Sequence, residues 1–535
     1  MSDSKKNTFF GGAAVLMAGA LIVKVIGACY QIPLTTVLGK VGMGHFKNAY
    51  IIFTLMLTIA TAGLPVALSK AISEANALGK QNQVQKTFHV ALGAFLVLGG
   101  LGFLVLFFGA GPLAAMQGDS GAKFALQALA PCVLFVCASS AFRGYAQGHS
   151  DMVPTSVSQV IEAVLKLVVG LLLAGFLMTL TFQSEAIKLE VSAAGGIIGV
   201  TSGAFVALIY LIFHQRRNRQ KERAVAGDTP DSSGKILANL VKIAIPITLG
   251  ASVASIISVI DANLVQNQLQ NALNLSETTA VGLYGTYQSA VTLYSFPSYF
   301  MVPFTAAVIP AVSAALARRD HLGSSRISES ALRVASLIAL PAGIGLSVLA
   351  TPIMTLLYSG SDLDMAIAGP LLAVLGIASI FVCITLMCNS IMQAHGFVNL
   401  PIVTAVVGGV VKLAVNYILV GNPAIGIHGA PIGTLCCYLI MAVLDIFIIV
   451  RVIPSPPNFF RAFAKPLVAS LLMGGAAWGV CSLLTQLGLG KLATIGGIAV
   501  GGCVYLVLVV VLRVFSKEDL ALMPKGDKIA KILRL

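Results

Sequence analysis

The chain has 535 residues, of which 57% are hydrophobic and only 10% are charged, and its formal net charge is +14. Soluble domains usually carry roughly 25% charged residues, so this composition excludes a water-soluble fold of this size and indicates a polytopic membrane protein. The basic excess does not indicate nucleic-acid binding, because the Lys and Arg residues occupy short gaps between apolar runs.

A membrane-spanning helix needs about 20 mostly apolar residues, and fourteen segments meet this requirement. The first resembles a signal peptide, because Lys5 and Lys6 precede it, but it continues to about Leu38 and is too long for one. All nine Cys fall in apolar segments without CxxC or Cys/His spacing, which favours packing over disulfides or metal binding. The predicted spans are 10–38, 48–76, 88–111, 124–147, 153–180, 191–214, 236–266, 282–317, 329–358, 366–395, 397–420, 426–452, 464–487 and 491–514.

The distribution of Lys and Arg predicts the orientation. With the N-terminus inside, the inner segments hold 25 of these residues and the outer loops hold five, including Lys40 and Lys47. Such a bias is typical of cytoplasmic segments. We therefore expect both termini in the cytoplasm and an even number of spans.

Polar residues recur at a common spacing of 246 residues. The first set is Gln147, His149, Lys166 and Leu167, and the second is Gln393, His395, Lys412 and Leu413. This repeat predicts an all-α protein with two six-helix lobes related by a pseudo-two-fold axis along the membrane normal. The predicted parts are an N-terminal lobe (1–225), a C-terminal lobe with the end of the linker (226–455), and two extra helices with a cytoplasmic tail (456–535).

Ionisable residues inside membrane spans are functional candidates, because they cost several kcal/mol in hydrocarbon. Lys24, Lys166 and Lys412 fall in the first, fifth and eleventh spans. We predict that they line a cavity for an anion such as pyrophosphate. Glu162 lies one turn before Lys166, so these two could instead form a self-neutralising pair. Arg143, at the inner end of the fourth span, either admits an anionic head group or anchors the helix at the membrane surface.

No P-loop, HExxH motif or catalytic constellation is present in the sequence. We therefore expect a transporter driven by the membrane potential or an ion gradient, with no resident cofactor.

Several strings resemble one family. They are Lys24-Val-Ile-Gly27, Ala62-Gly-Leu-Pro65, Arg143-Gly-Tyr-Ala-Gln147-Gly-His149 and Pro154-Thr-Ser-Val-Ser158-Gln159-Val-Ile-Glu162. Together they resemble the polysaccharide-export branch of the multidrug/oligosaccharidyl-lipid/polysaccharide (MOP) flippase superfamily. Within it, the chain looks most similar to the Gram-positive group of stage V sporulation protein B and MurJ-type lipid II flippases.

The resemblance implies a flippase for undecaprenyl-linked saccharides that works by alternating access in a bacterial plasma membrane. Lys24 matches the basic residue of the family's first helix, whereas two further basic positions of lipid II flippases fall near Tyr30 and Thr292. The resemblance also suggests a cation site for Na⁺ as the coupling ion. Its oxygen ligands here would be Asp261, Asn416 and Thr434. Alternatively, Asp261 is an interfacial residue near the outer head groups, and the Lys412 ammonium stands in for a metal ion.

The sequence thus predicts a monomeric flippase for lipid II or a related lipid-linked saccharide with a pyrophosphate. Its expected partners are membrane lipids and cell-wall synthesis proteins, and no nucleic acid. One alternative is a MATE-like cation-coupled drug exporter, which would favour carboxylates over lysines in its cavity. Another is a membrane-embedded glycan polymerase or ligase, which would need catalytic groups in larger outer loops than these.

Overall fold

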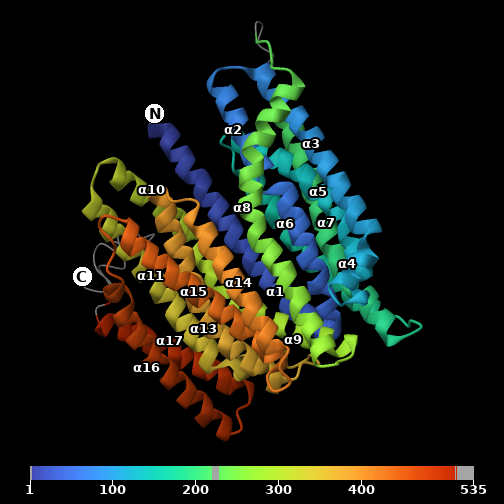
Figure 1. Cartoon of the computed structure of the whole chain (residues 1–535), viewed down its shortest axis with the longest axis vertical. Helices are drawn as coiled ribbons and strands as arrows, with labels where there is room; N and C mark the ends of the chain where they lie inside the picture. Colours follow the sequence, from blue (N-terminus) through green and yellow to red (C-terminus); the bar gives the residue numbers. More distant parts are fainter. Residues whose placement is uncertain (1–2, 220–227, 513, 515–535) are drawn as a thin grey trace. The chain divides into compact units, whose positions relative to one another are not determined.

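The computed structural model describes residues 3–219, 228–512 and 514, and in these ranges every long element is a helix, as predicted (Figure 1). The chain forms two compact units, Met1–Gly285 and Thr286–Leu535, which are treated separately below. The predicted cytoplasmic tail beyond residue 514 and part of the predicted linker lie outside the described residues.

The first unit contains ten complete helical elements and the beginning of an eleventh. They are α1 (Asp3–Thr61), α2 (Leu64–Ala77), α3 (Gln81–Phe108), α4 (Ala110–Met116), η1 (Ser120–Ala122), α5 (Lys123–Gly148), α6 (Val153–Thr179), α7 (Glu185–Arg219), α8 (Ser233–Asn267), η2 (Gln268–Ala272) and the start of α9 (Glu277–Tyr294). α8 packs against α1, α2 and α3, which is why this unit extends beyond residue 225, where the repeat suggested a lobe boundary.

The long helix α1 is a hairpin of two helical legs. Gly39 alone within it has non-helical dihedrals (φ 67°, ψ −176°), a combination that is essentially restricted to glycine. The rings of Tyr30 and Phe46 have centroids 6.1 Å apart, whereas sixteen residues of a straight helix would separate them by about 24 Å. Figure 1 shows α1 leading away from the N-terminus and the chain returning to α2. The two legs are therefore antiparallel neighbours.

The hairpin also explains the number of spans. The described residues contain 13 helical segments long and apolar enough to cross a membrane, and Ala18–Ala77 counts as one of them. Because this segment folds back at Gly39, it accounts for the first two of the fourteen predicted spans. The loop expected around Lys40 and Lys47 is absent, because the second leg resumes directly after Gly39.

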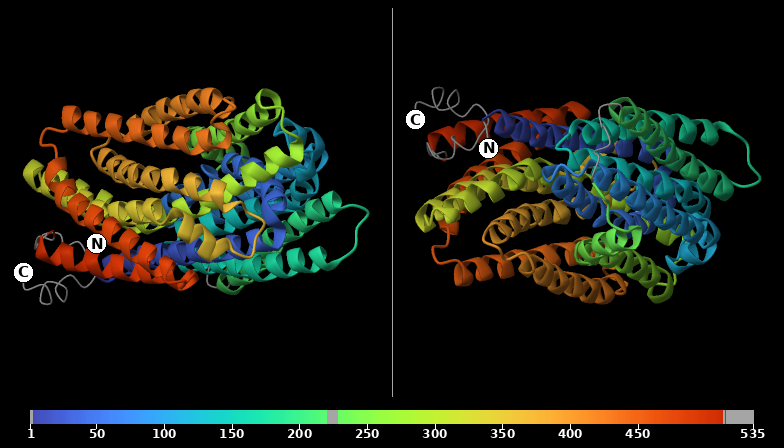
Figure 2. Two further views of the ribbon diagram at one scale, coloured as in Figure 1. Left: turned by 90° about the horizontal axis from the view of Figure 1, so that it is seen from below. Right: turned by 90° about the horizontal axis from the view of Figure 1, so that it is seen from above.

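The second unit holds the remaining helices. They are the end of α9, α10 (Phe296–Ala317), α11 (His321–Val348), α12 (Ala350–Tyr358), α13 (Met365–Ala394), α14 (Leu400–Val420), η3 (Gly426–His428), α15 (Gly429–Val452), α16 (Phe459–Gln486) and α17 (Lys491–Val511). α16 packs against α11, and α17 lies beside α16 (Figure 2). These last two helices are the predicted additions to the repeat.

Local hydrogen bonds repeat at the spacing of 246 residues. His149 Nδ1 lies 3.0 Å from the Tyr145 carbonyl, and His395 Nδ1 lies 2.8 Å from the Ile391 carbonyl. The hydroxyl of Ser158 donates to the Thr155 carbonyl at 2.9 Å. In the other unit, Thr404 makes the corresponding bond to the Pro401 carbonyl at 3.2 Å. The sequence repeat thus has a counterpart in the geometry of α5–α6 and α13–α14.

The described end of the linker is fixed to the first unit by one carboxylate. Asp228 Oδ2 accepts the backbone N–H groups of Asn82 (2.7 Å) and Gln83 (3.1 Å) in the first turn of α3, where such donors lack helical partners. Nearby, Asp231 accepts from Lys235 Nζ at 2.7 Å, and this hydrogen bond holds the pKa of the Asp231 carboxyl below its usual range. The linker therefore runs along the end of α3 before α8 begins.

Gly39→Ala tests the hairpin. Any side chain is strained at this φ and ψ, so we expect the free energy of unfolding to fall by about 1–3 kcal/mol. Thermal unfolding of the purified protein in detergent measures the loss. Gly93→Ala in α3 is the matched control, because a methyl group there meets nothing within 4 Å. Equal melting temperatures for the two variants would contradict the assignment of the turn to Gly39.

Candidate functional site

The first unit encloses a cavity of about 470 Å³ between both legs of α1 and helices α2, α5, α6 and α7. Four of the five predicted substrate-binding residues line it. The polar lining residues are Lys24, Tyr50, Thr61, Ser140, Arg143, Gln147, Thr155, Gln159, Glu162 and Lys166. Residues from the first, fourth and fifth predicted spans thus meet at one place, as the sequence predicted for Lys24 and Lys166.

The carboxylate of Glu162 is paired across two helices. Arg143 Nη2 of α5 lies 3.1 Å from Glu162 Oε2 of α6, and Arg143 Nε donates to Ser158 Oγ at 2.9 Å. The two charged side chains are 11% and 26% exposed, so the pair is largely shielded from solvent. Glu162 therefore neutralises Arg143 and joins α5 to α6, whereas the sequence had suggested an intrahelical pair with Lys166.

The ammonium of Lys166 lies over two aromatic rings. Its Nζ is 5.2 Å from the ring centre of Tyr30 and 4.9 Å from that of Tyr50, within the range of cation–π attraction. The two tyrosines belong to opposite legs of α1, so the Gly39 hairpin creates this arrangement. The Tyr30 hydroxyl donates to the Gly196 carbonyl of α7 at 2.7 Å, which fixes its ring.

The cavity has an excess of positive charge. Lys24, Arg143 and Lys166 are cationic and Glu162 is the one acidic residue in the lining. The Glu162 carboxylate pairs with Arg143, so the lining carries more cationic than acidic groups. Two ammonium groups facing one small space repel each other, and an anion between them would relieve this repulsion.

The other predicted site residues lie elsewhere. Lys412 of α14 belongs to the second unit and is not among the residues that line this cavity. Asp261 of α8 is in the first unit, whereas Asn416 of α14 and Thr434 of α15 are in the second, and all three are buried. Asn416 Oδ1 packs against Gly433, so it is a neighbour of Thr434.

No group of three or more His, Cys, Asp or Glu residues in the described ranges is arranged to hold a metal ion. The cation site suggested by the family resemblance, with oxygen ligands from Asp261, Asn416 and Thr434, stays a prediction.

A buried polar network near the hairpin turn was not predicted. Asp119 Oδ1 lies 2.6 Å from His45 Nδ1, and Asp119 Oδ2 accepts a hydrogen bond from Asn48 Nδ2 at 2.6 Å. Asn48 Oδ1 in turn accepts from Gln266 of α8 at 2.7 Å. Lys47, expected in an outer loop, is buried and donates to Gln31 of the other leg at 2.8 Å. The close spacing of His45, Lys47 and Asn48 after Gly39 is the sequence feature that could have indicated this network.

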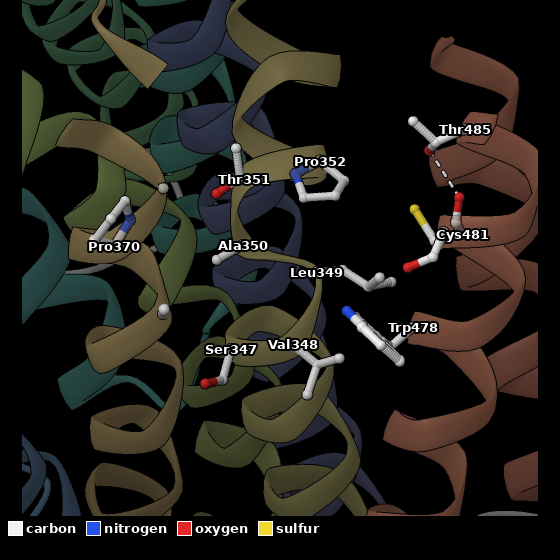
Figure 3. A pocket seen from close by; sticks show the side chains of 13 residues that line it. Ser347, Val348, Leu349, Ala350, Thr351, Pro352, Pro370, Trp478, Cys481 and Thr485 are labelled. Atoms are coloured by element: carbon white, nitrogen blue, oxygen red, sulfur yellow. Dashed lines mark hydrogen bonds between the residues drawn. The ribbon is translucent and has the colours of Figure 1, made fainter. Parts of the chain in front are cut away.

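A second cavity lies in the second unit and has a different character. It has a volume of about 660 Å³ and is lined by the α11–α12 junction, α13 and α16. Figure 3 shows Trp478 pointing toward Leu349 at that junction, and Thr485 donating to the Cys481 carbonyl at 2.7 Å. No Lys, Arg, Asp or Glu is among its lining residues, so it offers no charge for an anionic group.

Comparison with known proteins gives the family. The model of a polysaccharide biosynthesis protein family matches residues 9–316, more than half of the chain. The chain belongs to this family.

Two curated relatives from Bacillus subtilis (strain 168) align along nearly the whole chain. Stage V sporulation protein B is 24% identical over 97% of this chain and 98% of its own length. Lipid II flippase MurJ is 24% identical over 92% of this chain and 94% of its own length. The predicted resemblance to this group is confirmed.

Solved structures show the same fold. Lipid II flippase MurJ in an inward closed conformation has a TM-score of 0.71 at 16% identity, covering 93% of this chain and 98% of that one. An inward-facing MATE family multidrug transporter of the MOP superfamily has a TM-score of 0.65 at 16% identity, covering 81% and 96%. The chain is a multi-pass membrane protein with the fold of transporters, and the relatives with named activities are flippases and transporters rather than enzymes.

The pair between Arg143 and Glu162 can be tested by exchanging its partners. Glu162→Arg or Arg143→Glu alone leaves two like charges together, and we expect each to lower the free energy of unfolding by about 1–3 kcal/mol. The double exchange restores an ion pair and should recover much of that loss, measured as the melting temperature in detergent. Additive destabilisation in the double variant would contradict a direct pair.

Proposed function

We propose that this protein is a flippase that translocates an undecaprenyl-linked glycan precursor, lipid II or a related lipid-linked saccharide, across a bacterial plasma membrane. The observation that carries the proposal is the cavity of the first unit, whose lining holds three cationic side chains, Lys24, Arg143 and Lys166, and one acidic side chain, Glu162. The family, and relatives that include a lipid II flippase, support it.

The cavity matches the chemistry of a pyrophosphate linkage. Lys supplies a compact point charge with three donors and needs no fixed fork geometry, so it suits a phosphate group that must bind and then leave. The amides of Gln147 and Gln159 and the hydroxyls of Thr61 and Ser140 line the same space and can donate to sugar or phosphate oxygens. A charged linkage and a polar saccharide would thus both find partners there.

Arg143 has a different part in this scheme. Its guanidinium is held in place by hydrogen bonds to Ser158 and Glu162, so it is a fixed part of the cavity lining and cannot turn toward a substrate. The ammonium of Lys166 is oriented by the rings of Tyr30 and Tyr50, so it can turn toward an anion at small cost. We therefore assign substrate contact to Lys24 and Lys166, and positioning to Arg143 and Glu162.

The charge of the lining argues against export of cationic drugs. A cationic drug would meet two ammonium groups and a carboxylate that is already paired. The fold shared with MATE transporters therefore does not extend to their substrates in this proposal. Alternating access, driven by the membrane potential or an ion gradient, is the mechanism that we propose. Within the second unit, the oxygens of Asn416 and Thr434, with Lys412, are where we propose that a coupling ion or a second charge acts.

Lys24→Ala and Lys166→Ala test the proposal. Each substitution removes one charged donor to the pyrophosphate, so we expect the flipping rate to fall by about 10- to 100-fold. The measurement uses proteoliposomes with a fluorescent undecaprenyl-pyrophosphoryl saccharide, whose accessible fraction is read with a membrane-impermeant quencher.

Lys123→Ala is the matched control, because Lys123 is exposed at the start of α5 and does not line the cavity. It should flip the lipid at the wild-type rate. If Lys24→Ala and Lys166→Ala are folded and also keep that rate, the cavity is not the substrate site. If the wild-type protein flips none of the lipid-linked saccharides offered, the proposed function is wrong.

A further inference from the structure

Asp445 is an unusual acid within the second unit. It lies on α15, two turns before the end of that helix, and its side chain has no exposed surface. Among the described residues, neither of its carboxylate oxygens has a hydrogen-bond partner. α15 packs between α13 and α14, so the carboxyl is enclosed by protein.

Asp119 and Glu162 have polar partners, in contrast to Asp445. Asp119 in the first unit is also fully buried, but His45 and Asn48 both reach its oxygens at 2.6 Å. Glu162, less buried, has the guanidinium of Arg143. An ionised carboxylate without such partners is strongly disfavoured inside a protein. Asp445 therefore differs from these two acids in what compensates it.

The internal repeat places an amide in the second unit where the first unit has a guanidinium. At the spacing of 246 residues, Arg143 corresponds to Asn389 and Ser158 to Thr404. In the first unit, the Ser158 oxygen donates its own proton to a backbone carbonyl and accepts from Arg143. In the second, Thr404 also donates to a backbone carbonyl, but an amide stands at the arginine position.

The Thr404 hydroxyl is near Asp445 but makes no hydrogen bond to either carboxylate oxygen. Because its proton is directed to the Pro401 carbonyl, its oxygen presents lone pairs and can serve as an acceptor. A carboxylate would meet this oxygen with repulsion, whereas a carboxylic acid could donate to it. The Thr404 proton is therefore directed away from Asp445, and neither carboxylate oxygen receives a hydrogen bond from it.

The ionisable groups around α15 offer no substitute charge. On α15 itself, on α13 and the residue after it, on α14 and η3, and on α9, whose Tyr287 contacts Thr434, they are Cys383, Cys388, His395, Lys412, Tyr417, His428, Cys436, Cys437, Tyr438, Arg451, Tyr287 and Tyr294. Cys388 is close enough for Asp445 to act on it electrostatically, and its thiol supplies no positive charge. Lys412 lies eight residues beyond Thr404, or about 12 Å along α14. Arg451 stacks on Phe447 at 5.4 Å.

We propose that Asp445 is a proton-binding site, occupied while α13, α14 and α15 are packed as here, and that it releases its proton to water when these helices separate. Release leaves a carboxylate that must be hydrated, so the charged state opposes close packing of the three helices and the protonated state favours it. In the flippase cycle, on whose proposed function this last step rests, the proton would couple the conformation of the second unit to a proton gradient.

Infrared spectroscopy tests the occupancy without any transport. The wild-type protein at neutral pH should show the carbonyl band of a protonated carboxylic acid, shifted in D₂O. This band should be absent in Asp445→Asn and displaced in Asp445→Glu, which keeps a carboxyl should the amide variant fold poorly. Asp364→Asn is the matched control: Asp364 is exposed and caps α13, and an amide keeps that cap. A band unchanged in both Asp445 variants would overturn the proposal.

Flipping under a pH gradient tests the coupling. With the membrane potential clamped, a tenfold proton gradient should change the distribution of a fluorescent undecaprenyl-pyrophosphoryl saccharide by up to about tenfold for one proton per cycle. Asp445→Asn should still flip the lipid but ignore the gradient. An identical response in this variant would overturn the coupling role. If the wild-type protein flips no such lipid, the proposed function fails, and the infrared result still decides whether Asp445 binds a proton.

Discussion

A charged group in an apolar interior is costly without a partner, and several of the described helices are joined by contacts that supply one. Arg143 and Glu162 link α5 to α6, and the carboxylate of Asp119 links the second leg of α1 to the turn before α5. Lys47 reaches across the hairpin to Gln31. Each contact satisfies a group that would otherwise cost several kcal/mol in a low-dielectric environment. The polar contacts, rather than the apolar surfaces, specify which helices meet at which height.

The hairpin at Gly39 is the element on which the candidate site depends. It brings Tyr30 and Tyr50 to the same level on opposite legs, so that both rings face Lys166. Aromatic rings stabilise an ammonium without neutralising it, whereas a carboxylate would leave little charge for a ligand. The site therefore keeps a usable positive charge while remaining stable. This combination is what a transporter of anionic lipids needs, because the charge must be present both before the substrate binds and after it leaves.

Composition and apolar length predicted most of the helices, because the length of an apolar span depends on the membrane and not on tertiary contacts. The intramembrane positions of Lys24 and Lys166 could be read in the same way. The partner of Glu162 could not, since both Lys166 on its own helix and Arg143 on another were in reach, and only the packing of α5 on α6 distinguishes them. The turn at Gly39 could not be predicted either, because one glycine within an apolar segment does not distinguish a tight turn from a continuous helix. The basic stretch before α8 suggested a boundary, but the packing of α8 on α1 extends the first unit past it.

The two units share the internal repeat but differ in the charged residues that it carries. Ser158 and Thr404 keep the same hydrogen bond to a carbonyl three residues earlier, so the local helix geometry has been retained in both. The charged groups differ between the two units. In the first unit, Arg143 pairs with Glu162. In the second unit, an asparagine occupies the position of the arginine, and the acid, Asp445, belongs to another helix. An acid that is paired with a cation stays ionised when it is buried. An acid without a cation binds a proton when it is buried and releases the proton when water reaches it. The first unit is thereby suited to hold a substrate charge, and the second to respond to a change in helix packing.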